Sequence, residues 1–139
     1  MDPDSVVAKL ELMRGALDVL DSVGAPTAED LRADPVLRGA VERYLMLLVD
    51  QAVAVNLHLA NTLGDGAERD YTASFPAAAA VGAIPDDLAD ELARSAGMRN
   101  VLVHEYVRVD LDLVAAAVPT AVDGYRRYVS AVAAFVAGR

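Results

Sequence analysis

The sequence predicts an all-α protein, a four- to five-helix up-and-down bundle built as a single helical domain over residues 1–139. Apolar residues recur at the three- and four-residue spacing of amphipathic helices, and no convincing run alternates as strands do. Gly, Pro and Asp residues divide these apolar stretches into segments that short connections would join. A chain of 139 residues, 55% of them hydrophobic, is long enough to bury one core.

The first predicted helix runs from about Asp4 to Val23 and ends at Gly24 and Pro26. One buried face is indicated by its apolar stripe, which consists of Val6, Leu10, Met13, Leu17 and Leu20. The next segment, residues 27–33, is predicted to be a turn or a short helix.

The second long helix is predicted from about Pro35 to Leu63. Asp34 is a suitable N-cap, and Pro35 at the first helical position is already in a helical conformation. The segment is apolar on most faces, so we expect the central, buried helix of the bundle, stopped by residues 64–66, Gly-Asp-Gly.

Three further segments complete the predicted bundle. Residues 70–80 should form a short helix interrupted near Pro76. Another helix should start at Pro85 or Asp86, and Gly97 should close or bend it. The last helix should begin at Asp110 and reach about residue 136, with a kink or break near Pro119.

Charge and composition exclude several classes of protein. The net charge is −9, from 21 acidic and 12 basic residues, which disfavours a general nucleic-acid binder. Eleven of the bases are arginines, which suit local bidentate phosphate contacts. The absence of cysteine removes disulfides and thiolate metal sites. No apolar run is long enough for a membrane span and the N-terminus is acidic, so a cytoplasmic protein is expected.

The segment from Arg99 to Tyr106 carries most of the reactive side chains. It reads Arg-x4-His-x-Tyr, so an arginine, His104 and a tyrosine fall within eight residues. These groups can bind a phosphate, move a proton and offer a hydroxyl. On a helix, Arg99, Asn100, His104 and Tyr106 occupy one arc of roughly 160°. The arc is wide for one pocket, and two copies across a two-fold axis would close it better, so we expect a homodimer.

A purely structural interpretation of these residues stays open at this point. Arg99 can cap a helix, His104 can hydrogen-bond within the core, and Tyr106 can pack with its hydroxyl on a partner. Short motifs of this kind match often by chance. The residues alone therefore leave three alternatives: an enzyme, a non-catalytic binding module and a plain helical bundle.

The sequence around the motif resembles one known family. Residues 97–106, Gly-Met-Arg-Asn-Val-Leu-Val-His-Glu-Tyr, are similar to the signature of the HepT-like toxins in the HEPN superfamily (the DUF86 group). Residues 109–114, the opening of the second long helix at 40–45, and the elements at 71–75 and 81–84 resemble the family too. One departure lies late in the second long helix, where Ala54 and Leu57 replace an Asp and an Asn while His58 is kept.

The resemblance implies a fold, an activity and a partner. Members are metal-independent RNA endonucleases, toxins of type VII toxin–antitoxin systems paired with a MntA-type nucleotidyltransferase. It implies catalytic roles for Arg99, His104 and Asn100, in phosphate binding, proton transfer and orientation. It implies that Tyr106 accepts AMP from the antitoxin, which would block the cleft. No cofactor and no metal are expected.

Other polar residues and one rival function complete the prediction. His58, on an apolar helix, is expected to be a satisfied core histidine, and two histidines without cysteine disfavour a zinc site. Asp50 and Glu42 are expected to pair with arginines, although both can line a cleft. The acidic charge favours the alternative of a non-catalytic helical dimer that binds and regulates a nucleotidyltransferase or a nucleotide.

Overall fold

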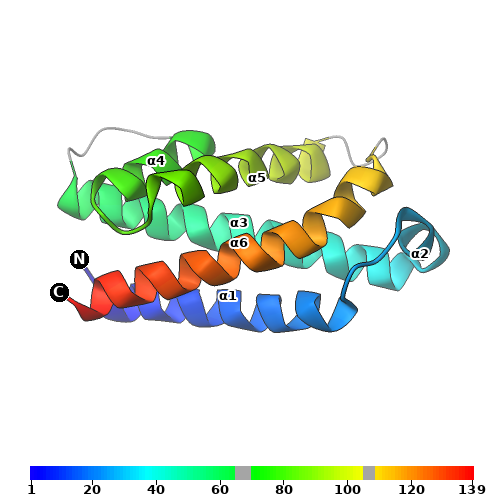
Figure 1. The fold of residues 1–139 in the computed structure, drawn as a ribbon, viewed down its shortest axis with the longest axis horizontal. Helices are drawn as coiled ribbons and strands as arrows, with labels where there is room; N and C mark the ends of the chain where they lie inside the picture. The colour runs from blue at the N-terminus through cyan, green and yellow to red at the C-terminus, as the bar shows by residue number, and fades with distance from the viewer. Residues whose placement is uncertain (65–69, 105–108) are drawn as a thin grey trace.

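The computed structural model describes residues 1–64, 70–104 and 109–139. This part of the chain contains six helices and no strand (Figure 1). The helices are α1 (Pro3–Val23), α2 (Ala28–Ala33), α3 (Pro35–Leu63), α4 (Tyr71–Ala80), α5 (Asp86–His104) and α6 (Leu111–Ala137). The all-α prediction is confirmed, with one helix more than the largest number expected, because the segment at 28–33 is helical.

The four long helices α1, α3, α5 and α6 run up and down along one common axis (Figure 1). The short helix α4 packs on α3 and α5, and α2 covers the end of the bundle where α3 begins. The two termini lie together at the opposite end (Figure 1). None of the helices in the described ranges combines the length and apolar character needed to cross a lipid bilayer.

Aspartate and threonine side chains begin most of the helices. Asp2, Asp34, Asp70 and Asp110 each accept hydrogen bonds from backbone N–H groups in the first turn of their helices. Thr27 does the same for α2 in a capping box. These caps satisfy helix N–H groups that have no intrahelical acceptor, so local sequence sets where these helices begin.

The helix breaks predicted at three residues are wrong, whereas the alternatives of a bend at Gly97 and a kink near Pro119 stay predictions. Helix α5 runs through Gly97 because Leu92, Ala96 and Leu102, buried on either side, hold it against the bundle. That packing outweighs the roughly 1 kcal/mol that a helical glycine costs. Helix α4 continues through Pro76, which is exposed, so water can solvate the carbonyl group that the missing N–H leaves unpaired. Helix α6 likewise passes Pro119 without a break.

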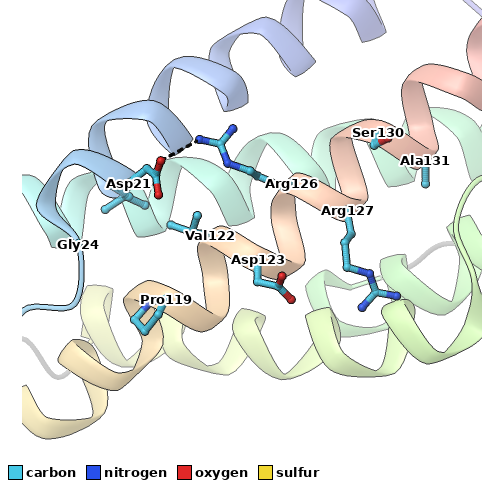
Figure 2. A pocket seen from close by; sticks show the side chains of 10 residues that line it. Asp21, Gly24, Pro119, Val122, Asp123, Arg126, Arg127, Ser130 and Ala131 are labelled. Atoms are coloured by element: carbon cyan, nitrogen blue, oxygen red, sulfur yellow. Dashed lines mark ion pairs between the residues drawn. The ribbon is translucent and has the colours of Figure 1, made fainter.

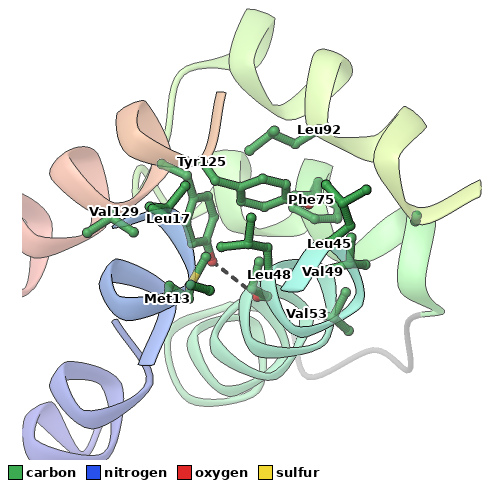
Figure 3. Close-up of a cluster of buried hydrophobic side chains, with 14 of the residues drawn as sticks. Met13, Leu17, Leu45, Leu48, Val49, Val53, Phe75, Leu92, Tyr125 and Val129 are labelled. Carbon is green, nitrogen blue, oxygen red and sulfur yellow. Dashed lines mark hydrogen bonds between the residues drawn. The ribbon is translucent and has the colours of Figure 1, made fainter. Parts of the chain in front are cut away.

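The core fills the space between all the long helices. Figure 3 shows side chains from α1, α3, α4, α5 and α6 meeting in one cluster, among them Met13, Leu48, Phe75, Leu92 and Tyr125. Phe75 and Tyr125 each pack edge-to-face on Tyr128, with ring centroids 6.4 Å and 6.1 Å apart. This shared core fixes α5, which carries the Arg99–His104 segment, against α3 and α4.

Candidate functional site

Arg99 lies on α5 facing α3 and α4. Its Nε donates a hydrogen bond to Asp50 Oδ1 of α3 over 3.0 Å, and this contact is also an ion pair. Its guanidinium carbon lies 5.0 Å from the centre of the Tyr71 ring of α4, the geometry of a cation–π contact. Two other helices therefore hold one arginine side chain.

Asp50 and Tyr71 also contact each other. The Tyr71 hydroxyl donates to the same Asp50 oxygen, Oδ1, over 3.2 Å. Burial, and next the negative charge of Asp50, raise the pKa of Tyr71, while the positive charge of Arg99 opposes them. Tyr71 therefore stays a hydrogen-bond donor at neutral pH. The three residues form one connected cluster, named here the Arg99 cluster.

The Arg99 cluster orients the guanidinium without using all its donors. Arginine carries five N–H groups, one on Nε and four on the two terminal nitrogens. The contact with Asp50 uses Nε. The terminal nitrogens are the ones that bind a phosphate through two parallel hydrogen bonds. The arrangement suits an anion-binding arginine whose direction is fixed by its neighbours.

Arg99 also lines a cavity of about 470 Å³ between α3, α5 and α6. Apolar side chains form much of the wall, including Leu45 and Val49 of α3 and Ala121 of α6. Ser95 and Tyr125 line it too, and Ser95 Oγ and Tyr125 Oη are 2.5 Å apart. The cavity therefore places Arg99, the side chain that would bind a phosphate, beside an apolar slot.

The structure places the other predicted site residues only in part. Asn100 and His104 belong to α5 together with Arg99, and His104 is the last residue of that helix. A helical backbone from Arg99 to His104 agrees with the geometry assumed for the motif. Tyr106 lies outside the described residues.

The predictions for the remaining polar residues hold in two cases. Asp50 pairs with Arg99, and Glu42 pairs with Arg38 over 2.8 Å, as structural salt bridging predicts. His58 is half-buried at the end of α3, and its Nε2 accepts the backbone N–H of Asp2 over 3.1 Å. His58 is therefore satisfied as expected, but it holds the N-terminus of α1 and is not fully in the core.

The basic pair at 126–127 faces a second hollow, of about 810 Å³, between the end of α1 and α6 (Figure 2). Arg126 pairs with Asp18 and Asp21, over 3.2 and 3.7 Å. Arg127 pairs with Asp87 and Glu91, both over 3.4 Å. These carboxylates offset the positive charge of the pair, so the hollow has no net basic character.

A buried polar network escaped the sequence analysis. Asn56 of α3 is fully buried and donates from Nδ2 to Ser74 Oγ of α4 over 3.2 Å. Tyr128 of α6 donates to Asn56 Oδ1 over 2.6 Å and lies 3.1 Å from the carbonyl oxygen of Ala52. No spacing rule connects these residues, and an asparagine inside an apolar helix was the one available signal.

Among residues 1–64, 70–104 and 109–139, no three His, Cys, Asp or Glu side chains lie close enough to hold a metal ion together.

Comparison with known proteins gives concordant results. The sequence model of the ribonuclease HepT-like family matches residues 13–132. A protein of Aphanizomenon flos-aquae named tRNA nuclease HepT is 31% identical over 132 residues, which are 93% of this chain and 88% of that protein.

Solved structures of the same shape come from toxin–antitoxin complexes. One is the tri-AMPylated HEPN toxin of Shewanella oneidensis in complex with MNT antitoxin. It has a TM-score of 0.81 and 21% identity, covering 96% of this chain and 99% of that one. Another is a toxin–antitoxin structure with AMP-PNP, with a TM-score of 0.79 and 21% identity, covering 95% and 99%. At this level of identity the likeness establishes a shared fold.

Proposed function

The chain belongs to the HepT-like ribonuclease family, and from that premise we propose that it is the toxin of a toxin–antitoxin pair and cleaves RNA through Arg99, Asn100 and His104. The observation that carries the proposal is the Arg99 cluster, in which α3 and α4 hold an arginine of the family signature at the wall of a cavity. The reaction takes place in the cytoplasm and needs no metal ion.

The proposed reaction is an internal transesterification of RNA. The ribose 2′-oxygen attacks the adjacent phosphorus, and a neutral His104 accepts the 2′-hydroxyl proton. The bond from phosphorus to the 5′-oxygen breaks, and a protonated histidine donates the proton that this oxygen takes up. Arg99 binds the phosphate and offsets the charge that builds up on it, and Asn100 orients His104 or the phosphate. The products are a 2′,3′-cyclic phosphate and a 5′-hydroxyl.

A homodimer supplies both histidines in this proposal. One chain offers one His104, whereas the reaction needs a base and an acid at the same time. A two-fold axis beside the ends of two α5 helices would place two Arg99–His104 segments around a single phosphate. Mass measurement at micromolar concentration tests this, and a monomer that is fully active contradicts it.

The proposed partner is a MntA-type nucleotidyltransferase that transfers AMP to Tyr106. The phenol oxygen would attack the α-phosphorus of ATP, with release of pyrophosphate and of the phenol proton. Each AMP adds a negative phosphate two residues after His104 in the sequence, where it would compete with RNA for Arg99. The names of the structural relatives, a tri-AMPylated toxin with MNT antitoxin and a complex with AMP-PNP, support this partner.

The central experiment compares purified wild-type protein with Arg99→Ala and His104→Ala on transfer RNA, in the presence of EDTA. Transfer RNA is the first substrate to test because the Aphanizomenon relative is named a tRNA nuclease. We expect cleavage by the wild type and a loss of at least about 100-fold in each variant, since one acid or base contributes about 10²–10⁴-fold. His104→Ala protein that cleaves at the wild-type rate would contradict the mechanism.

One observation favours a second candidate function, a non-catalytic dimer that binds and regulates a nucleotidyltransferase. The chain carries a net charge of −9, and arginines 14, 32, 38, 99, 126 and 127 all pair with carboxylates. Coexpression with the nucleotidyltransferase separates the two functions. A stable complex without RNA cleavage at any protein concentration would favour the binding module. AMP additions that disappear in Tyr106→Phe, together with cleavage by the unmodified protein, would favour the toxin.

A further inference from the structure

The cavity beside Arg99 has the size and lining of a site for one small aromatic ligand. Its volume of about 470 Å³ lies within the roughly 300–1,000 Å³ of small-ligand sites. Leu45, Val49 and Leu102 supply apolar surface at its wall. Met98 adds a thioether, which contacts aromatic rings favourably. A flat ring can enter a slot of this kind and lose its contact with water.

Charge along α5 gives the cavity a direction. Arg99 lies toward the C-terminal end of the α5 residues that line the cavity, and Arg94 lies a little more than one turn before it. Asp87 and Glu91, which pair with Arg127, lie two to three turns before Arg99. A phosphate would be attracted to Arg99 and Arg94, whereas the end with Asp87 and Glu91, whose charges Arg127 offsets, holds no excess positive charge for it. A nucleotide would therefore place its phosphate at Arg99 and extend its base along the cavity, away from that residue.

The hydroxyl pair in the cavity wall has no proton left to donate. The Leu92 carbonyl oxygen can only accept, so the single proton of Ser95 Oγ goes to that bond. The proton between Ser95 Oγ and Tyr125 Oη must then come from Tyr125. Each hydroxyl carries one proton and two lone pairs. Both protons are used inside the protein, so the pair can offer only lone pairs to a ligand.

We propose that this cavity is a base-binding subsite for the nucleotide beside the scissile phosphate, and that it favours a base bearing an amino group over uracil. The inference rests on the proposed ribonuclease function. Adenine, cytosine and guanine present exocyclic amino groups, which can donate to the lone pairs of Ser95 and Tyr125. Uracil presents carbonyl oxygens at the matching positions, and these find no donor in this hydroxyl pair. Its one donor, the ring N3–H, lies between those oxygens, so using it brings a carbonyl oxygen toward the lone pairs of the second hydroxyl. Single-stranded RNA is read in this way, through unstacked bases inserted into protein pockets.

The experiment titrates AMP, CMP, GMP and UMP into the full-length protein by calorimetry. We expect the three amino-bearing nucleotides to bind more tightly than UMP. Ser95→Ala removes the acceptor of the Tyr125 proton and frees that hydroxyl to donate, so the preference of AMP over UMP should shrink by at least threefold. Four equal affinities in wild type and variant, or no binding at millimolar nucleotide, would overturn the proposal.

A cavity-filling variant tests the site independently. Ala121→Leu adds three carbons to the wall and should weaken all four nucleotides by roughly five- to 150-fold, the range that the stacking of one base contributes. Ala116→Leu makes the same change at an exposed position of α6 that is not among the lining residues, and should leave binding unchanged. Equal binding by both variants would overturn the proposal.

Two outcomes separate this inference from its alternatives. Nucleotide titration needs no RNA cleavage, so an inactive wild-type protein would contradict the proposed function and leave the binding test intact. Should Ala121→Leu alter the oligomeric mass while nucleotide binding persists, the cavity is an interface between copies and the base subsite is refuted. Circular dichroism and urea unfolding confirm that Ala121→Leu folds, and Ser95→Ala tests the site if it does not.

Discussion

Replacing Tyr128 by phenylalanine should destabilise the fold by leaving one buried oxygen without its donor. Tyr128 is 0% exposed, and its hydroxyl donates to Asn56 Oδ1 over 2.6 Å. Asn56 is also 0% exposed, so no water can take the place of the lost donor. The ring itself, with its edge-to-face contacts to Phe75 and Tyr125, is retained in the variant. The change therefore removes only the hydroxyl, and with it the bond to Asn56 and the 3.1 Å contact with the Ala52 carbonyl oxygen.

The expected loss follows from burial. A buried acceptor left unsatisfied costs about 1–3 kcal/mol, and nothing in this environment reduces it. Tyr125→Phe is the matched control, because Tyr125 lies one turn earlier on α6 and is only 1% exposed. Its hydroxyl donates to Ser95, which is half-buried and keeps its own bond to the Leu92 carbonyl. Ser95 loses an optional partner, so this variant should cost at most about 1 kcal/mol.

Urea unfolding followed by circular dichroism measures both free energies. Tyr128→Phe should lower the free energy of unfolding more than Tyr125→Phe does, by about 1 kcal/mol or more, with equal m-values in all three proteins. Equal losses, or a larger loss in Tyr125→Phe, would refute the reasoning. In that case the Asn56 network would contribute no more to the free energy of unfolding than the hydrogen bond between Ser95 and Tyr125.

Three further predictions concern pH, the α5 helix and the Arg99 cluster. Burial raises the pKa of both Tyr125 and Tyr128 above the ordinary value near 10, so the stability from their neutral forms is fully present below about pH 10. The free energy of unfolding should decline as pH rises further, by up to about 1.4 kcal/mol per pH unit for each tyrosine. In urea titrations at alkaline pH, each Phe variant should lack the part of this decline that its own tyrosine causes. Gly97→Ala should raise the free energy of unfolding by up to about 1 kcal/mol and keep nuclease activity, because α5 is continuous there and the added Cβ meets nothing within 4 Å. Loss of nuclease activity in a well-folded variant would mean that catalysis needs a bend at this residue. Asp50→Asn should cost at most about 1 kcal/mol in stability, since the side chains of Arg99 and Asp50 are 22% and 33% exposed. It should nevertheless lower RNA cleavage by about tenfold or more, because Arg99 loses the charge that orients it. Tyr71→Phe keeps the ring under Arg99 and should lower cleavage less; a larger loss in Tyr71→Phe than in Asp50→Asn would contradict the role of Asp50.

The Arg99–His104 segment was recognisable from sequence because its residues are neighbours on one chain. A helix places residues at fixed angles, so the arc of these side chains follows from spacing alone. Asp50 and Tyr71 lie 49 and 28 residues before Arg99, and no local rule brings them to it. From sequence alone, Asp50 was expected to pair with an arginine, but local spacing does not say which one. Packing of α3 and α4 against α5 decided that pairing.

The interruptions predicted at Pro76, Gly97 and Pro119 show how local propensity can mislead. Glycine and proline lower helix stability by a fixed local amount, roughly 1 and 3 kcal/mol. Each helix here buries apolar side chains on both sides of the residue, and its continuity indicates that this burial outweighs the local cost. A rule that considers one residue at a time cannot weigh that gain.

By itself the sequence determined the helical class, the helix starts and the reactive segment. Each depends on residues a few positions apart: caps at Asp34 and Asp110, apolar stripes of period 3.6, and the run from Arg99 to His104. Only the tertiary structure decided which residues hold Arg99, where the Asn56 network lies and which acceptors the Ser95 and Tyr125 hydroxyls donate to. These features join residues up to 76 positions apart, and they exist only because helices distant in sequence bury a common core.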